Sequence, residues 1–321
     1  MTSRELVKRS LNFEMVVRTP LEVLPGVEGF VSDVVYPDYK YGKGKSSGIS
    51  GKKGAYTDSW GCVFECAEDG VKGEVKQSLL ADWSALDGFC PPWDVLNDAD
   101  LSMVNRQCEK SDKFMIHTWG IEPFQRMQYL RGTERLFMDL AYGDRAVFKL
   151  RDMVHEYYLK EVEMWAATDV DGIHLEDDWG TQIALLISPN LWREFFKPIY
   201  KDYCDIAHSR GKYVLMHSDG NIADIIPDMI EIGIHAINAQ LDCMDVEKLA
   251  ELYHGKIAFW GGFGRQYFLP FGTTDEVRSE ARRIINAFYQ YGKTGIIGHC
   301  CRDKGHKEEN IAAFYDELSK V

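Results

Sequence analysis

Apolar and polar positions follow a regular cycle along the second half of the chain. Short apolar runs alternate with longer amphipathic stretches of helical period. The short runs predict buried strands at 172–176, 213–216, 236–238, 257–260 and 295–297. The longer stretches predict helices at 189–210, 222–232, 246–253, 274–291 and 307–318. Five successive strand–helix units indicate a parallel sheet with right-handed crossovers.

The first half of the chain is less regular. Its pattern predicts strands at 19–24 and 113–119, a strand and hairpin at 56–65, and helices at 2–13, 94–110, 123–130, 133–141 and 144–167. Strands near Leu21, Val63 and Met115 raise the count to about eight, the number in a closed barrel. We therefore predict an α/β fold: a single (β/α)8 TIM barrel spanning 1–321, with an N-terminal extension.

A doubly wound open sheet is the alternative architecture. The sequence has no GxGxxG after the first predicted strand and no P-loop pattern, so nucleotide-binding versions of that fold lose support.

Residues 42–54 are rich in glycine, serine and lysine and contain too few apolar residues to join a core. We predict a mobile Gly/Lys/Ser-rich loop there. It is either a simple disordered connection or a lid over a binding site.

Composition narrows the class of protein. The formal net charge of −13 argues against nucleic-acid and basic membrane-surface proteins. No apolar run approaches the length of a membrane span, and the charged, helical start does not resemble a signal peptide. The eight cysteines show no paired spacing, which favours a reducing compartment over a disulfide framework. We expect a cytoplasmic protein.

Polar residues follow the predicted strands, where a barrel gathers its active site. They are His117 and Trp119, Glu176 to Asp178, His217 and Asp219, Asn238 and Gln240, and His299 to Cys301. Because barrel interiors use bulky aliphatic side chains, such a polar rim is more often functional than structural.

Three adjacent acids, Glu176, Asp177 and Asp178, end one of these strands. Successive side chains on a strand point to opposite faces, so at most two of the three face the barrel mouth. A carboxyl group near other acids has a raised pKa, which suits a general acid. The alternative is a helix cap within a solvated charge run.

His217, Asp219 and Cys300 form a sharper set. Nitrogen, oxygen and thiolate ligands with one open position are typical of catalytic zinc. A metal-free site with His217 as the acid or base fits these residues equally well.

Several motifs together resemble the uroporphyrinogen decarboxylase superfamily, most closely its corrinoid-dependent methyltransferase branch. They run over nearly the whole chain, at 58–64, 130–134, 177–180, 187–193, 197–198, 217–221, 298–300 and 309–310. The resemblance implies one (β/α)8 barrel.

Departures from the family patterns distinguish the activities within the superfamily. Decarboxylases carry an arginine-rich segment after the first strand, whereas residues 21–26 here contain no arginine. Thiol-specific methylcobamide methyltransferases bind zinc through His-x-Cys and a later cysteine. His217 and Cys300 match two of these positions, while Asp219 replaces the middle cysteine. A harder ligand set favours an oxygen-bound substrate.

The resemblance therefore points to methyltransferase I components of O-demethylases, which move a methyl group from an aryl methyl ether to cob(I)alamin. It implies a zinc held by His217 and Cys300, with Glu176 or Asp219 completing the shell; Cys301 is the alternative thiolate. Asp177 or Asp178 would donate a proton, and Trp60, His117, Trp119, Asn238 and Gln240 would line the pocket.

The sequence has no Asp-x-His-x-x-Gly corrinoid signature, so the corrinoid would arrive on a partner protein. A tetrapyrrole decarboxylase, a methyltransferase for thiols or other methyl donors, and a binding homologue without activity are the alternatives.

Overall fold

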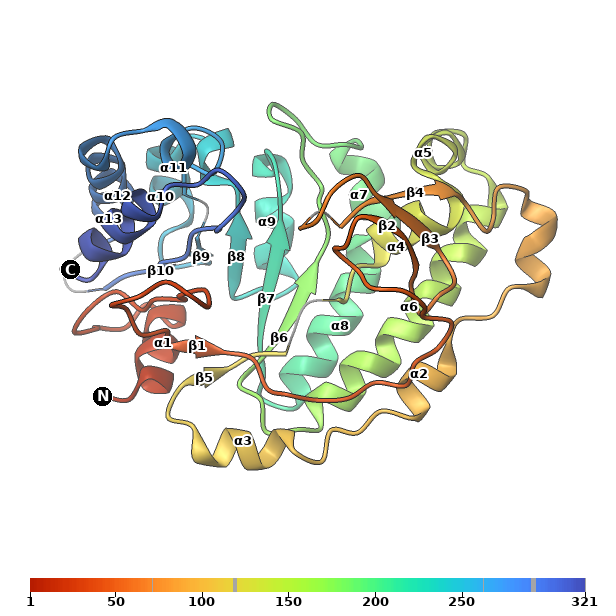
Figure 1. The fold of residues 1–321 in the computed structure, drawn as a ribbon, viewed down its shortest axis with the longest axis horizontal. Coiled ribbons are helices and arrows are strands. Elements are labelled where there is room, and N and C mark those ends of the chain that lie inside the picture. Colours follow the sequence, from red (N-terminus) through yellow and green to blue (C-terminus); the bar gives the residue numbers. More distant parts are fainter. Residues whose placement is uncertain (71, 118–119, 262, 290–292, 321) are drawn as a thin grey trace. The chain divides into compact units, whose positions relative to one another are not determined.

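The structure is a computed structural model that describes residues 1–70, 72–117, 120–261, 263–289 and 293–320. Figure 1 shows the helices and strands of the chain. The backbone divides into two compact units. Unit 1 comprises Met1–Pro37, Asn105–Gly120 and Asp169–Val321, and unit 2 comprises Asp38–Val104 and Ile121–Thr168. The single-domain assignment stays a prediction.

Unit 1 contains a five-stranded parallel sheet in the order β10-β9-β8-β7-β6. Its strands are β6 (Gly172–Glu176), β7 (Tyr213–Ser218), β8 (Ala236–Ala239), β9 (Ala258–Trp260) and β10 (Ile296–Ile297). Each of these strands overlaps an apolar run that the sequence pattern predicts. The α/β class with a parallel sheet is therefore confirmed.

Further parallel pairing continues this sheet around a ring. Ile116, next to β5 (Phe114–Met115), bridges to Gly172, and β5 pairs with β1 (Val34–Val35). The Asp33 amide then donates to the Leu21 carbonyl at 2.7 Å, and Leu21 bridges in parallel to Gly298. Among the described residues, eight parallel segments thus follow one another around a TIM-barrel-like ring.

The second segment of this ring differs from the prediction. We predicted a strand near Val63, but β3 (Val63–Cys66) lies in unit 2, where it pairs antiparallel with β2 (Gly54–Thr57) and β4 (Glu74–Gln77). The ring uses β1 instead. Two residues are too few to show any periodicity, so the pattern could not reveal β1.

The predicted N-terminal extension is helix α1 (Ser3–Leu11). Its buried face carries Val7 and Leu11, which share one hydrophobic cluster with β1, β5, β7, β8, β9 and β10 side chains. The helix therefore covers an apolar region to which most of the ring contributes.

Helices follow the strands of unit 1 in sequence. They are α7 (Pro189–Phe195), α8 (Lys197–Ser209), α9 (Ile226–Glu231), α10 (Val246–Tyr253), α11 (Phe268–Phe271), α12 (Thr274–Phe288) and α13 (Glu308–Leu318). The predicted helix 189–210 is two helices, because Pro198 lacks an amide hydrogen and starts a new helix.

Unit 2 packs the three-stranded antiparallel sheet with helices. These are α2 (Trp93–Asn97), α4 (Pro123–Arg131), α5 (Thr133–Tyr142) and α6 (Arg145–Ala166), and α3 (Val104–Lys110) begins at the unit boundary. The hairpin predicted at 56–65 is confirmed as β2 and β3. Segment 42–54 is anchored by hydrogen bonds from Gly42 to Val95 and from Lys45 to Ser59. Its mobility stays a prediction.

Two glycines bring the ends of β6 and β7 together. The Gly180 amide donates to the Asp219 carbonyl at 3.1 Å, and the Asn221 amide donates to the Thr181 carbonyl at 2.7 Å. A Cβ on Gly220, where φ is +80°, would lie 2.3 Å from the Gly180 carbonyl carbon. The two loops can approach this closely only because neither residue has a side chain.

We expect Gly220→Ala to destabilise the protein by about 2 kcal/mol or more, because it adds backbone strain and a steric clash. Thermal and urea unfolding would measure this loss. Gly255→Ala is a matched control for the strain alone, since φ is +81° there and nothing lies within 4 Å of the added Cβ. Equal losses in the two variants would show that the loop contact contributes nothing.

Candidate functional site

A histidine between two carboxylates lies at the carboxyl ends of β6 and β7. In the parallel register, Glu176 on β6 is opposite His217 on β7, and His217 is opposite Asn238 on β8. Asp219 follows β7 directly, and Asp178 is the second residue after β6. The chain therefore brings side chains from two successive strand–loop units to one place.

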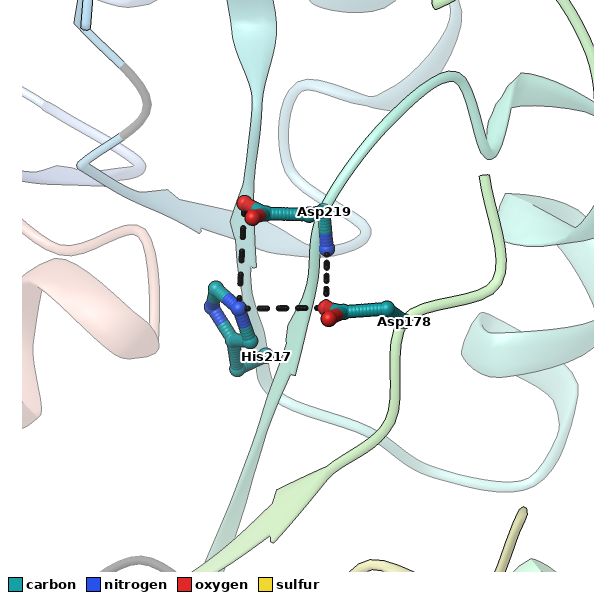
Figure 2. Close-up of side chains that lie close together, drawn as sticks. All are labelled: Asp178, His217 and Asp219. Atoms are coloured by element: carbon teal, nitrogen blue, oxygen red, sulfur yellow. Dashed lines mark hydrogen bonds and ion pairs between the residues drawn. The ribbon is translucent and has the colours of Figure 1, made fainter. Parts of the chain in front are cut away.

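Figure 2 shows this cluster of Asp178, His217 and Asp219. The His217 Nε2 atom lies 3.4 Å from Asp178 Oδ1 and 3.8 Å from Asp219 Oδ1. The Asp219 amide also donates to Asp178 Oδ1 at 3.0 Å. One ligand-type atom from each residue lies within 4.8 Å of the other two, which is close enough to share one ion.

Asn238 fixes the orientation of the His217 ring. The His217 Nδ1 atom lies 2.7 Å from Asn238 Oδ1, which is an acceptor only. Nδ1 therefore carries the hydrogen, and Nε2 faces the two carboxylates. That nitrogen either binds a metal ion or carries a second proton.

The carboxylates change the acidity of this histidine. Burial disfavours the charged ring, but hydrogen bonding and charge from Asp178, together with the charge of Asp219, outweigh burial and raise the pKa of His217 to about 9. The metal-free ring is therefore an imidazolium at neutral pH.

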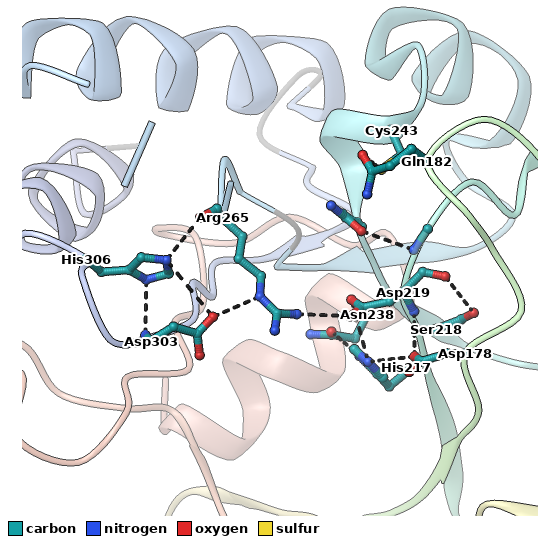
Figure 3. Close-up of polar contacts among 12 residues, drawn as sticks. Asp178, Gln182, His217, Ser218, Asp219, Asn238, Cys243, Arg265, Asp303 and His306 are labelled. Carbon is teal, nitrogen blue, oxygen red and sulfur yellow. Dashed lines mark hydrogen bonds and ion pairs between the residues drawn. The ribbon is translucent and has the colours of Figure 1, made fainter. Parts of the chain in front are cut away.

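Arg265, between β9 and α11, adds a cation to the cluster (Figure 3). Its Nη1 donates to Asp219 Oδ2 at 2.9 Å, and its Nε donates to Asp303 Oδ2 at 2.8 Å. The His306 Nε2 atom lies 2.9 Å from the Arg265 carbonyl oxygen and holds the same loop. Arg265 was not predicted as a site residue, because its distance in sequence from β7 conceals the contact.

The three adjacent acids have different surroundings. Asp177 is fully buried and accepts a hydrogen bond from the Tyr200 hydroxyl of α8. Asp178 joins His217. Glu176 is partly buried at the end of β6 and is outside the group of close ligand atoms.

The two adjacent cysteines are also in different environments. Cys300 is 2% exposed, its amide lies 3.4 Å from the Tyr315 hydroxyl, and burial raises the pKa of its thiol. Cys301 lines a small cavity together with His217, Asp219, Asn238, Gln240, Arg265 and His299. Of the two cysteines, Cys301 is therefore the one that lines the cavity beside the cluster.

A buried charged pair, Glu22 and His299, lies among the segment at Leu21, β9 and the end of β10. Glu22 is 2% exposed, and it accepts hydrogen bonds from Tyr36 and from Trp260, each at 2.6 Å. Its Oε2 atom also lies 3.0 Å from His299 Nδ1. Burial lowers the pKa of His299, but the charge of Glu22 outweighs it and raises that pKa to about 10. The only signal for Glu22 in the sequence is one acid within an apolar run.

The remaining predicted pocket residues are distributed as follows. His117 is buried at the end of β5, and Gln240 accepts a hydrogen bond from the Gly220 amide at 3.2 Å. Trp60 is buried in unit 2, where its ring lies 4.6 Å from that of Tyr157. Trp119 lies outside the described residues. The lining role of these residues stays a prediction.

The donor set fits a divalent metal ion. One imidazole nitrogen and two carboxylates could supply three ligands to an ion such as zinc. With two oxygen ligands, the site is harder and more Lewis-acidic than a thiolate-rich one.

Polar groups gathered at the strand ends of a parallel ring define an enzyme of the barrel type. Residues 116–321 match the uroporphyrinogen decarboxylase (URO-D) family, and the chain belongs to this family.

Two individual proteins are similar to the chain. A uroporphyrinogen decarboxylase from Chlorobium phaeobacteroides is 23% identical over 189 residues, which cover 57% of this chain and 49% of that protein. The match thus spans about half the length of this curated relative. A methyltransferase from Methanosarcina mazei has a similar fold, with a TM-score of 0.73, 15% sequence identity, and coverage of 100% of this chain and 99% of that one.

Within the described residues, no helix is long and apolar enough to cross a membrane.

We expect Asp178→Asn to lower the pKa of His217 from about 9 toward the ordinary 6.5. Because the folded-state pKa is raised, the ion pair stabilises the metal-free protein fully below about pH 6.5, and this contribution disappears as pH rises through about 9. NMR titration of labelled histidine measures the pKa, and unfolding at several pH values measures the stability. Asp152→Asn, a change at an exposed residue of unit 2, is the control. An unchanged His217 pKa in Asp178→Asn would contradict the assignment.

Proposed function

We propose that this protein is a methyltransferase that moves a methyl group from a methoxylated small molecule to the cob(I)alamin of a separate corrinoid protein. Its substrate is an aryl methyl ether, and the reaction is an O-demethylation. The fold shared with a methyltransferase supports this proposal. The observation that carries it is the cluster of Asp178, His217 and Asp219 at the strand ends.

The chemistry requires help at the ether oxygen. As the methyl carbon–oxygen bond breaks, the oxygen keeps the electron pair, and the methyl carbon forms a new bond with the electron pair of cobalt. Phenoxide is a poor leaving group, so a proton or a Lewis acid at the oxygen lowers the barrier.

His217 can meet this need as a general acid. Its Nε2 proton is held between two carboxylates, while Asn238 fixes the opposite side of the ring. A positioned proton donor typically contributes 10²–10⁴-fold to the rate. Arg265 holds Asp219 in place during this transfer.

A zinc ion fits the same residues. Asp178, His217 and Asp219 would hold it, with Cys301 as a nearby thiolate in the same cavity. When bound, it would polarise the ether oxygen as a Lewis acid. Asp177 is held by Tyr200, and Asp178 serves as the ionised partner of His217, so His217 takes the proton-donating role that we expected of this acidic pair.

The charge of the ring interior disfavours decarboxylation of a polycarboxylate. Instead of arginines, the first segment carries the buried carboxylate of Glu22. At the strand ends, His217 and Arg265 already pair with Asp178 and Asp219, so a polycarboxylate substrate would have to compete with these carboxylates for the two cations.

We expect the protein to convert cob(I)alamin to methylcobalamin in the presence of 2-methoxyphenol. The loss of the cobalt(I) absorption band measures this conversion. His217→Ala should slow this conversion at least about 100-fold. His208→Ala, at an exposed histidine of α8, is the matched control. No methyl transfer from any methoxylated arene, combined with carbon dioxide release from a tetrapyrrole, would instead establish a decarboxylase.

We expect zinc to co-purify with the protein at about one ion per chain. Asp178→Asn, Asp219→Asn and Cys301→Ser should each lower the zinc content, whereas Cys300→Ser should keep it. Elemental analysis of the purified variants measures this. If Cys300→Ser loses zinc and Cys301→Ser keeps it, Cys300 is the zinc ligand. If the wild type contains no zinc, the Lewis-acid mechanism is wrong and His217 acts as the general acid.

A further inference from the structure

Unit 2 contains a second cavity, of about 380 Å³, outside the cluster described above. This volume lies within the range of small-molecule sites. Ser46, Gly48 and Ser50 of segment 42–54 contribute to its lining. Every lining residue belongs to unit 2.

Aromatic side chains form much of this cavity. Tyr56 and Phe64 are cross-strand partners on β2 and β3, and their rings stack with centroids 4.9 Å apart and an interplanar angle of 9°. The Tyr129 ring of α4 meets Phe64 edge-on at 5.1 Å. Phe64 is 2% exposed, so the half-buried Tyr129 offers most of the ring surface on which a planar ligand can pack.

Two cations lie against the Tyr129 ring. The Lys72 Nζ atom is 5.2 Å from the Tyr129 ring centroid, and the Arg126 guanidinium is 5.3 Å from it. Their charges are balanced within the cavity lining. Glu122 Oε1 lies 2.8 Å from Arg126 Nη2, and Glu122 Oε2 lies 3.3 Å from Lys72 Nζ. Asp58 forms a further ion pair with Arg126.

This balance indicates the charge of the ligand. Two cations and two anions leave the lining formally neutral, so it attracts neither a strong anion nor a strong cation. Glu122 and Arg126 are 5% and 8% exposed, and burying an ion pair costs more than burying apolar side chains of similar size. A polar ligand group in the cavity can hydrogen-bond to these charged side chains, which offsets part of that cost.

We propose that this cavity of unit 2 binds an uncharged, monocyclic aromatic compound with a phenolic or ether oxygen. The ring packs on Tyr129 beside the buried Phe64, and the oxygen meets Lys72 and the serine hydroxyl groups of the rim. This cavity is separate from the cluster of Asp178, His217 and Asp219, and binding of the compound here does not rest on the proposed function.

Calorimetric titration of the full chain with 2-methoxyphenol, in the absence of corrinoid, tests the proposal. We expect saturable binding that weakens at least tenfold in Tyr129→Leu. Tyr142→Leu, at an 82% exposed tyrosine of α5 outside the cavity, should bind like the wild type. Phe64→Leu provides a second wall variant if Tyr129→Leu fails to fold.

Two further ligands test the contributions of ring stacking and of ligand charge to binding separately. 2-Methoxycyclohexanol keeps the oxygens but has no π system, and should bind at least tenfold more weakly. 2-Methoxybenzoate should bind weakly to the wild type and more tightly to Glu122→Gln, which leaves the lining one positive charge in excess. No saturable binding of 2-methoxyphenol, or equal binding by the wild type and both wall variants, would overturn the proposal. A bound ring without methyl transfer would overturn only the proposed function.

Discussion

The candidate site depends on one close backbone contact, between Gly180 and Gly220. Parallel strands end at the same edge of a sheet, but their following loops usually diverge into separate helices. Here the loops remain paired for several residues beyond β6 and β7 through hydrogen bonds such as Gly180 to Asp219. This pairing places Asp178 and Asp219 next to the same histidine nitrogen. The cluster can form because Gly180 and Gly220 have no side chains to keep the two loops apart.

The residues around this contact restrict His217 from several directions. Asn238 fixes Nδ1, the two carboxylates face Nε2, and Arg265 holds the second oxygen of Asp219. The site is therefore organised before any ligand arrives, which lowers the reorganisation needed during a reaction. Asp303 and His306 extend the restriction to the loop that carries Arg265.

Much of the ring could be predicted from sequence because its strands are buried on both faces and read as continuous apolar runs. The same reasoning failed at β1, where two residues carry no period, and at Val63, whose alternation belongs to an antiparallel sheet. His217 and Asp219 could be proposed because parallel strand ends meet at one edge. Arg265 could not, since its partner is 46 residues away and no rule of spacing connects them.

The two roles proposed for His217 exclude each other at one atom. Nε2 cannot carry a proton and bind a metal ion at once, so zinc must displace a proton from a ring whose pKa is about 9. The carboxylates that raise this pKa are also the ligands that would attract the ion. Metal binding therefore strengthens as pH rises, whereas a proton-donating site loses its acid over the same range. The pH dependence of methyl transfer has opposite slopes under the two mechanisms, and this sign distinguishes them even where the same substitutions abolish both.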